Sequence, residues 1–355
     1  MSTTLDRWLR EALTPVPTPT GVTSRELVRQ AVELRAPARI PYAFLHPLES
    51  DFFELAELTR QLDREHAAAL GSIYTDAWQV THEVSPGLFD RVLEHPLEDL
   101  SRLSDYRFPS VHELIDMERL LPFARDARSA GKHIVAADPV LLFERVRSLM
   151  GFESMLLAPR VDRNGFQALL DALTDLTLES INDYARCADV DSFMTWQDFG
   201  TQSGLMVGPE EFRTLYAPGL TRVAQAAHDH GMYFILHCCG RIEGLIPEFI
   251  EIGVDVLQLD QPRLIGHQTL RERFGGKVCF WNAVDTLWSS QGNRSTQAIE
   301  SEVREMRTAF SDLPGGLMAR HYPQPEDIDL PDGFHEVSRQ AFLRAMVAST
   351  SRGSI

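Results

Sequence analysis

The chain alternates between short runs rich in β-branched and aromatic residues and longer stretches with helical periodicity. The pattern predicts helices between the short runs, such as one that begins at the capping box of Ser110 and Glu113 and ends near Gly131. Eight runs have strand character: residues 39–45, 72–78, 133–138, 193–198, 233–239, 255–260, 277–282 and 316–320.

Eight strands separated by helical crossovers predict a parallel sheet, and eight is the number that closes a (β/α)8 TIM barrel. A doubly wound open sheet is the weaker alternative, because no Gly-x-Gly-x-x-Gly turn follows the first run. Two short helical patterns precede that run. We therefore expect a helical extension over residues 1–35, the barrel over 36–347 and a flexible tail over 348–355.

Composition narrows the class of protein. The sequence has 355 residues, of which 44% are hydrophobic, and 51 acidic against 34 basic residues give a net charge of −17. Such a surface repels polyphosphate, so neither nucleic acid nor an anionic membrane is an expected partner. Four cysteines are too few for a disulfide scaffold, and no run approaches about 18 apolar residues. We expect a cytoplasmic protein without a membrane span.

Polar residues stand at the predicted strand ends, where barrel enzymes carry their active sites. One aspartate after a strand often only caps the following helix, but a polar residue at seven strand ends is a stronger indication of a site. The residues concerned are Asp76, Asp138, Asp198, His237, Asp260, Asn282 and His321.

His237 and Cys239 form the sharpest candidate pair. Residues two apart on a strand point to the same side, so both face the barrel interior if one does, and Cys238 then faces the helices. An imidazole and a thiolate are typical zinc ligands, and a catalytic zinc needs a third. His321 is the best candidate for it, and Cys279 is weaker. The competing interpretation is a hydrogen-bonded core histidine beside cysteines that only pack.

Aromatic residues also gather near the predicted strand ends. Trp78, Trp196, Phe199 and Trp281 either pack in the core or line a flat apolar pocket.

Several motifs resemble those of the uroporphyrinogen decarboxylase superfamily. They include Leu-His-Cys-Cys-Gly at 236–240, Asp-Phe-Gly-Thr-Gln at 198–202, Asn-Ala-Val-Asp at 282–285 and Tyr-Thr-Asp-Ala-Trp at 74–78, together with the Gly-Gly that leads to His321. The resemblance covers roughly residues 35–345. It implies a (β/α)8 barrel, in agreement with the strand count, and the superfamily often forms dimers, which leaves a homodimer open.

One branch of the superfamily decarboxylates a tetrapyrrole without a cofactor and holds its carboxylates with an arginine-rich N-terminal segment. Here the corresponding residues 39–46 lack paired arginines, and the sequence shows no basic pocket. Asp76 falls where that branch keeps a catalytic aspartate, and His321 where it keeps a histidine.

The other branch consists of corrinoid-dependent methyltransferases, in which a His-x-Cys motif supplies two zinc ligands. His237 and Cys239 match that motif. The third ligand of that branch is a late cysteine, but no cysteine follows Cys279 in this chain and His321 occupies the approximate place.

The resemblance favours a zinc-dependent methyltransferase that moves a methyl group between a small molecule and a corrinoid protein. His237, Cys239 and His321 would then bind zinc. Asp76, Asp198 and His321 would be catalytic, and Trp78, Trp196, Gln202 and Asn282 would bind substrate. A metal-free decarboxylase that uses Asp76, and a non-catalytic paralogue that binds a corrinoid or tetrapyrrole, are the alternatives.

Overall fold

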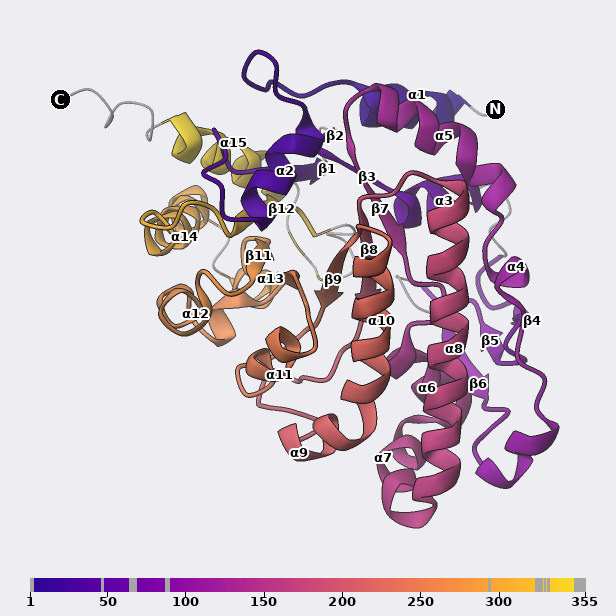
Figure 1. The fold of residues 1–355 in the computed structure, drawn as a ribbon. Coiled ribbons are helices and arrows are strands. Elements are labelled where there is room, and N and C mark those ends of the chain that lie inside the picture. The colour runs from indigo at the N-terminus through magenta and orange to yellow at the C-terminus, as the bar shows by residue number, and fades with distance from the viewer. Residues whose placement is uncertain are drawn as a thin grey trace.

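A nine-stranded sheet lies at the centre of the protein, with strand order β2-β1-β12-β11-β10-β9-β8-β7-β3 (Figure 1). The computed structural model describes residues 3–45, 48–63, 69–86, 90–292, 295–322, 328, 330 and 333–347. The strands of this sheet are β1 Tyr42–Leu45, β2 Leu48–Ser50, β3 Phe52–Glu54, β7 His133–Ala137, β8 Ser192–Trp196, β9 Tyr233–His237, β10 Val256–Leu259, β11 Cys279–Asn282 and β12 Leu317–Arg320.

All neighbours from β1 through β12 to β3 pair in parallel, whereas β2 forms an antiparallel hairpin with β1. The amide of Asp51, just before β3, donates to the carbonyl of Tyr42 on β1 at 2.8 Å and brings the two ends of the sheet together. The predicted (β/α)8 barrel is thus confirmed.

Helices surround the barrel (Figure 1). The α-helices are α1 Thr3–Leu13, α2 Ser24–Val32, α3 Leu55–Asp63, α4 Val111–Leu114, α5 Met117–Ser129, α6 Leu142–Met150, α7 Phe152–Val161, α8 Arg163–Cys187, α9 Pro209–Glu211, α10 Ala217–Asp229, α11 Ile246–Glu251, α12 His267–Phe274, α13 Thr286–Ser290, α14 Thr296–Ala309 and α15 Phe334–Val347. Two 3-10 helices, η2 Leu100–Asp105 and η4 Pro262–Leu264, and a π-helix, η3 Phe212–Tyr216, complete the set.

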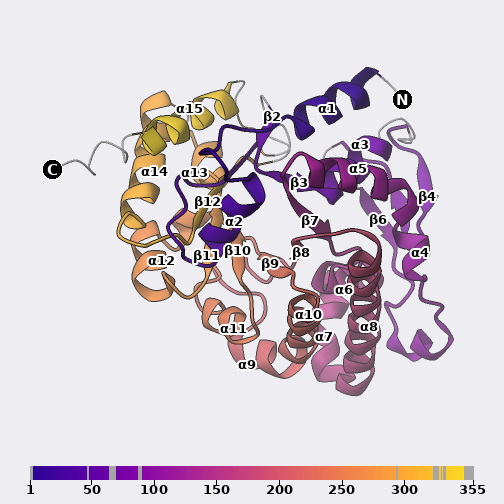
Figure 2. The same ribbon diagram turned by 45° about the horizontal axis from the view of Figure 1, so that its top comes forward.

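Strand alternation divides the core into two layers. Phe234, Leu236 and Cys238 pack outward against the helices, whereas Ile235 belongs to the interior cluster of the barrel. The same period places Trp196, His237 and Gln258 inward near the strand ends. Helix α2 lies across the amino-terminal end of the barrel, and its Val28 and Ala31 join the interior cluster (Figure 2).

The expectation for the second barrel strand was wrong. Residues 72–78 contain β4 Ile73–Thr75, which pairs with β5 Thr81–Glu83 and β6 Arg91–Glu94 in a separate antiparallel sheet. The second barrel strand is β3, which spans only three residues and directly follows the β2 hairpin. Its short apolar run was too brief to stand out from the sequence.

The predicted helical extension exists as α1 and α2. The predicted boundaries at residues 35 and 347 stay predictions, and the predicted tail lies outside the described residues. Within the described part of the chain, no helix has the length and apolar character needed to cross a membrane.

Candidate functional site

A cavity of about 470 Å³ opens at the carboxyl ends of the strands, where barrel enzymes carry their active sites. Its uncharged lining includes Leu141, Trp196 and Tyr322. Its polar wall is formed by Glu54, Glu57, Arg60, Glu144, Arg145, Arg147, Asp198, His237, Cys239, Asp260 and Arg320.

Three potential metal ligands meet in this cavity. The Nε2 atom of His237 lies 3.2 Å from Sγ of Cys239 and 3.6 Å from Oδ1 of Asp198. The three ligand atoms all lie within 4.8 Å of one another. Zinc–ligand bonds of about 2.0–2.3 Å in tetrahedral geometry separate neighbouring ligand atoms by roughly 3.3–3.6 Å. The arrangement therefore fits a zinc ion bound by one nitrogen, one sulfur and one oxygen.

Gln258 orients the imidazole of His237. Its Oε1 lies 2.7 Å from Nδ1 of His237, so that nitrogen carries the proton and Nε2 keeps a free lone pair toward Cys239. Asp198 is fixed in turn, because its Oδ1 accepts the backbone amide of Cys239 at 2.9 Å. The neutral tautomer with its outer nitrogen engaged is the form that a metal-binding histidine takes.

The environment of Cys239 favours a cation. Burial raises the pKa of its thiol well above the usual range, and the carboxylates of Asp198 and Asp260 raise it further. The thiol is therefore protonated when nothing positive lies beside it. Because metals bind cysteine as the thiolate, a divalent cation would release this proton and offset the local negative charge.

Two further carboxyl groups face the cavity with perturbed acidity. Burial raises the pKa of Glu54, at the end of β3, and Arg320 opposes that shift. Burial also raises the pKa of Glu144 on α6 to about 7, although Arg147 pairs with it at 2.5 Å. Perturbed carboxyl groups in a cleft are typical of functional sites.

A close contact between two glycines positions the Cys239 segment. Gly240 has a φ of +87°, and a Cβ there would lie 2.6 Å from the carbonyl carbon of Gly200. A Cβ on Gly200 would lie 2.6 Å from the carbonyl oxygen of Cys239. The loops after β8 and β9 can approach this closely only because neither residue has a side chain.

The structure does not place Asp76 at a barrel strand end. It lies beyond β4 in the small side sheet, where its Oδ1 accepts the amides of Trp78 and Val80 at 2.9 Å and its Oδ2 lies 3.0 Å from Nε2 of His82. Asp76 reaches the cavity only through Arg145, whose Nη1 lies 3.8 Å away. Trp78 is buried beneath the same guanidinium, 4.3 Å from its ring centroid.

The structure also does not bring His321 to the metal-ligand cluster. Its Nδ1 accepts the amide of Leu45 at 3.3 Å, and its Nε2 lies 3.0 Å from Oγ of Ser338 on α15. Its ring stacks on His335 at 4.4 Å and packs against Phe44. His321 follows the inward-facing Arg320 by one residue, so alternation turns it outward.

Asn282 and Gln202 lie outside the cavity lining, whereas Trp196 belongs to it. Asn282 pairs with Leu259 and Ala319, which face the helices, while Trp281 takes the inward position on β11. Gln202 is exposed in the loop after β8. Contrary to our expectation, neither residue is part of the cavity lining.

Sequence reasoning missed the residues that support the site. Gln258 lies two positions before Asp260 and therefore shares its inward direction, so strand alternation could have identified it. The cavity arginines also contradict the expectation of no basic pocket, because Arg60, Arg145, Arg147 and Arg320 converge from α3, α6 and β12. No local motif joins those segments.

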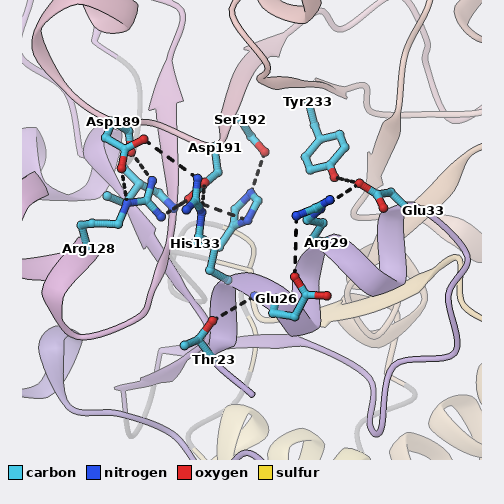
Figure 3. Close-up of polar contacts among 12 residues, drawn as sticks. Thr23, Glu26, Arg29, Glu33, Arg128, His133, Asp189, Asp191, Ser192 and Tyr233 are labelled. Atoms are coloured by element: carbon cyan, nitrogen blue, oxygen red, sulfur yellow. Dashed lines mark hydrogen bonds and ion pairs between the residues drawn. The ribbon is translucent and has the colours of Figure 1, made fainter. Parts of the chain in front are cut away.

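A larger hollow, of about 660 Å³, lies at the opposite end of the barrel. Figure 3 shows its polar groups, among them Arg29 bound to Glu33, which also accepts the hydroxyl of Tyr233. The buried His133 lies 2.7 Å from Ser192 at this end. Its charged groups neutralise one another, and it lies away from the strand ends that carry the chemistry of barrels.

Comparison with known proteins identifies a family for this chain. The family model described as uroporphyrinogen decarboxylase (URO-D) matches residues 139–316, half of the chain, and this segment contains Asp198, His237 and Cys239. The comparison with curated proteins gives no match.

Among solved structures, a methyltransferase from Methanosarcina mazei is similar, with a TM-score of 0.58 and 13% identity over 92% of this chain and 99% of that one. A glycosylated endo-beta-1,4-xylanase from Gloeophyllum trabeum has a TM-score of 0.43 and 10% identity over 92% and 100% of the two chains. The similarity to the methyltransferase supports the barrel fold.

Fold and site together define an α/β-barrel protein with a candidate metal-binding cavity at the carboxyl ends of its strands. With the family match across half of its length, the chain belongs to the uroporphyrinogen decarboxylase family.

Proposed function

We propose that the protein is a zinc-dependent methyltransferase that moves a methyl group between a small molecule and a corrinoid carried by a separate protein. The observation that carries the proposal is the cluster of Asp198, His237 and Cys239 within a cavity at the strand ends. Asp198 takes the place of the third ligand that sequence analysis had assigned to His321.

Zinc bound here would act as a Lewis acid, lowering the pKa of a substrate thiol or polarising the oxygen of a methyl ether. The residues of the chain do the rest. His237, Cys239 and Asp198 would hold the ion. Gln258 holds His237 in the binding tautomer.

The cavity wall would position the substrate and exclude water. Trp196, Leu141 and Tyr322 supply its apolar surface. Because burial keeps Glu54 protonated to higher pH than an exposed glutamate, its carboxyl can donate a proton to a leaving oxygen or sulfur.

Decarboxylation finds less support. That hypothesis needs Asp76 in the cavity to stabilise a cationic intermediate, but the Asp76 carboxylate is engaged by two backbone amides and His82. The cavity is also in the lower half of the roughly 300–1,000 Å³ range of small-molecule pockets. A tetrapyrrole polycarboxylate would fill far more space.

Metal analysis of the purified full chain tests the proposal. We expect one zinc ion per chain, and loss of that zinc in His237→Ala and Cys239→Ser. Cys238→Ser is the matched control, because Cys238 packs in the outer layer and should leave the zinc content unchanged. Zinc-free wild-type protein, or full zinc retention in Cys239→Ser, would contradict the metal site.

Turnover is tested with cob(I)alamin and a panel of methyl ethers and methyl thioethers. Methyl transfer breaks the bond from oxygen or sulfur to carbon, forms a cobalt–carbon bond and leaves the heteroatom to take up a proton. The change in the visible spectrum of the cobalamin reports it. Corrinoid binding without turnover of any donor would instead support a non-catalytic binder, and release of carbon dioxide from an acid would support a decarboxylase.

A further inference from the structure

The four cavity arginines differ in how fully their charge is neutralised. Arg60 binds Glu57 through two nitrogens at 2.8 and 2.9 Å, and Arg147 pairs with Glu144 at 2.5 Å. Bidentate or close pairs of this kind offset most of the positive charge of the guanidinium. Neither arginine is therefore the natural partner of an incoming anion.

Arg145 has no such close partner among the described residues. Its nearest carboxylate oxygen is Oδ2 of Asp76, 3.8 Å from Nη1, which is too far for a hydrogen bond. Asp76 already binds three other groups, so it offsets the arginine only in part. Burial lowers the pKa of Arg145, and the nearby Asp76, Tyr106 and Asp138 offset this effect only in part.

The guanidinium of Arg145 is nevertheless held firmly. It stacks 4.3 Å from the ring centroid of Trp78, and its Nε donates to the carbonyl of Val140 at 3.3 Å. Its backbone amide donates to the carbonyl of Leu141 at 2.7 Å. A cation fixed in one geometry loses little entropy when it binds an anion, which favours recognition of a planar carboxylate.

Backbone strain lies at the same place. Leu141 has a φ of +59° and a ψ of 67°, a left-handed conformation that costs a residue with a Cβ about 1–2 kcal/mol. This residue lines the cavity and begins the turn that presents α6 and Arg145. Strained residues of this kind cluster at ligand sites, where the surrounding structure maintains them.

Arg320 is the competing anion site. It is only 6% exposed and its Nη1 has no hydrogen-bond partner among the described residues. However, Asp260 lies 3.6 Å from that nitrogen, and Glu54 also interacts with the guanidinium. Asp76 and Asp138 act on Arg145 in a similar way, so the neighbouring carboxyl groups do not distinguish the two arginines. Exposure does: the side chain of Arg145 is 16% exposed and that of Arg320 only 7%, so Arg145 is the more accessible to a ligand in the cavity.

We propose that Arg145 is the anchor of a substrate carboxylate, and that the protein acts on a small organic acid with an apolar body. This inference rests on the proposed function for the reaction, although carboxylate binding itself needs no metal. The cavity suits such a ligand, because Trp196, Leu141 and Tyr322 supply apolar contacts and the volume of about 470 Å³ limits its size.

Benzoate and its uncharged isostere benzamide are suitable probes for the full chain. We expect calorimetry to show binding of benzoate to the wild type, and Arg145→Gln to weaken it by about tenfold or more. Benzamide binding should change little. The matched control is Arg222→Gln on α10, which removes an arginine that pairs with Asp175 outside the cavity lining and should bind benzoate within about twofold of the wild type.

Asp76→Asn gives a second readout that a purely structural role of Arg145 would not produce. The amide oxygen can still accept the amides of Trp78 and Val80, but the negative charge beside Arg145 disappears. We therefore expect benzoate to bind more tightly to this variant than to the wild type. Weaker binding would contradict the proposal.

Other outcomes also overturn it. They are absence of benzoate binding to the wild type, unchanged binding in folded Arg145→Gln, and loss of binding in Arg320→Gln with retention in Arg145→Gln. Zinc content, measured on the same samples, separates the two proposals. A zinc-loaded protein that binds benzoate independently of Arg145 refutes only the carboxylate anchor, whereas Arg145-dependent binding to a protein without zinc refutes only the metal site.

Discussion

The Nδ1 atom of His237 lies 2.7 Å from Oε1 of Gln258, across the paired strands β9 and β10. The contact fixes which nitrogen of His237 carries the proton. It also leaves Nε2 directed at Cys239 and Asp198, so that a buried glutamine prepares an imidazole for a metal.

Replacing Gln258 by leucine should therefore weaken zinc binding. Loss of such an outer partner typically lowers metal affinity by about 10–100-fold. Competition with a chromophoric chelator measures the affinity. Gln258→Glu is the matched control, because its carboxylate can still accept the Nδ1 proton, and we expect it to bind zinc more tightly than Gln258→Leu. Equal affinities in wild type and Gln258→Leu would show that the contact serves only packing.

Two variants distinguish Asp198 from His321 as the third zinc ligand. Asp198→Ala should reduce zinc affinity by more than the about 10–100-fold expected for an outer partner, since it removes a ligand atom. His321→Ala should keep the zinc, because that ring packs against Phe44 and His335 instead. Metal content after dialysis compares them directly, and the reverse order of the two variants would restore His321 as the ligand.

Gly240 should tolerate no side chain. In Gly240→Ala the new Cβ would lie 2.7 Å from the carbonyl oxygen of Thr201 at a φ of +87°, so the loop that carries Cys239 must shift. We expect a loss of about 2–4 kcal/mol in the free energy of unfolding and loss of bound zinc. Chemical denaturation and metal analysis measure these two effects.

Gly204→Ala is the control for that substitution. A Cβ at Gly204 would meet no atom within 4 Å, so its stability should match the wild type within about 0.5 kcal/mol. A Gly240→Ala protein as stable as this control would mean that the two loops are not as closely packed as the structure shows.

His133 should make the protein sensitive to acid. Burial lowers its pKa to about 4 from the ordinary value of 6.5. Between pH 6.5 and pH 4, His133 is therefore protonated in the unfolded chain but neutral in the folded chain. The free energy of unfolding falls as the pH drops through this window. Between pH 7 and pH 5 the contribution amounts to about 2 kcal/mol.

The variant His133→Gln tests this contribution. Because glutamine does not titrate, the loss of unfolding free energy between pH 7 and pH 5 should be smaller in the variant than in the wild type. Urea denaturation at both pH values measures the difference. An identical pH dependence in the two proteins would assign the acid sensitivity to other groups at the amino-terminal end of the barrel, which Figure 3 shows.

Much of the barrel followed from the sequence. Strand period and crossover length are local properties, and seven of the eight expected strands are barrel strands in the structure. The exception, residues 72–78, has genuine β character but pairs antiparallel outside the barrel. Strand character does not specify the partner strand, which depends on the turn after β1 and on the brief β3.

The sequence by itself also selected His237 and Cys239 and assigned Cys238 to the outer layer, because alternation along one strand needs no tertiary information. Only the tertiary structure decided what surrounds that pair. Asp198 meets the pair because β8 and β9 pair in register and two glycines let the following loops approach closely. His321 lies one residue beyond Arg320 and therefore points toward α15. Contacts between separate segments depend on register and loop geometry, which no local pattern encodes.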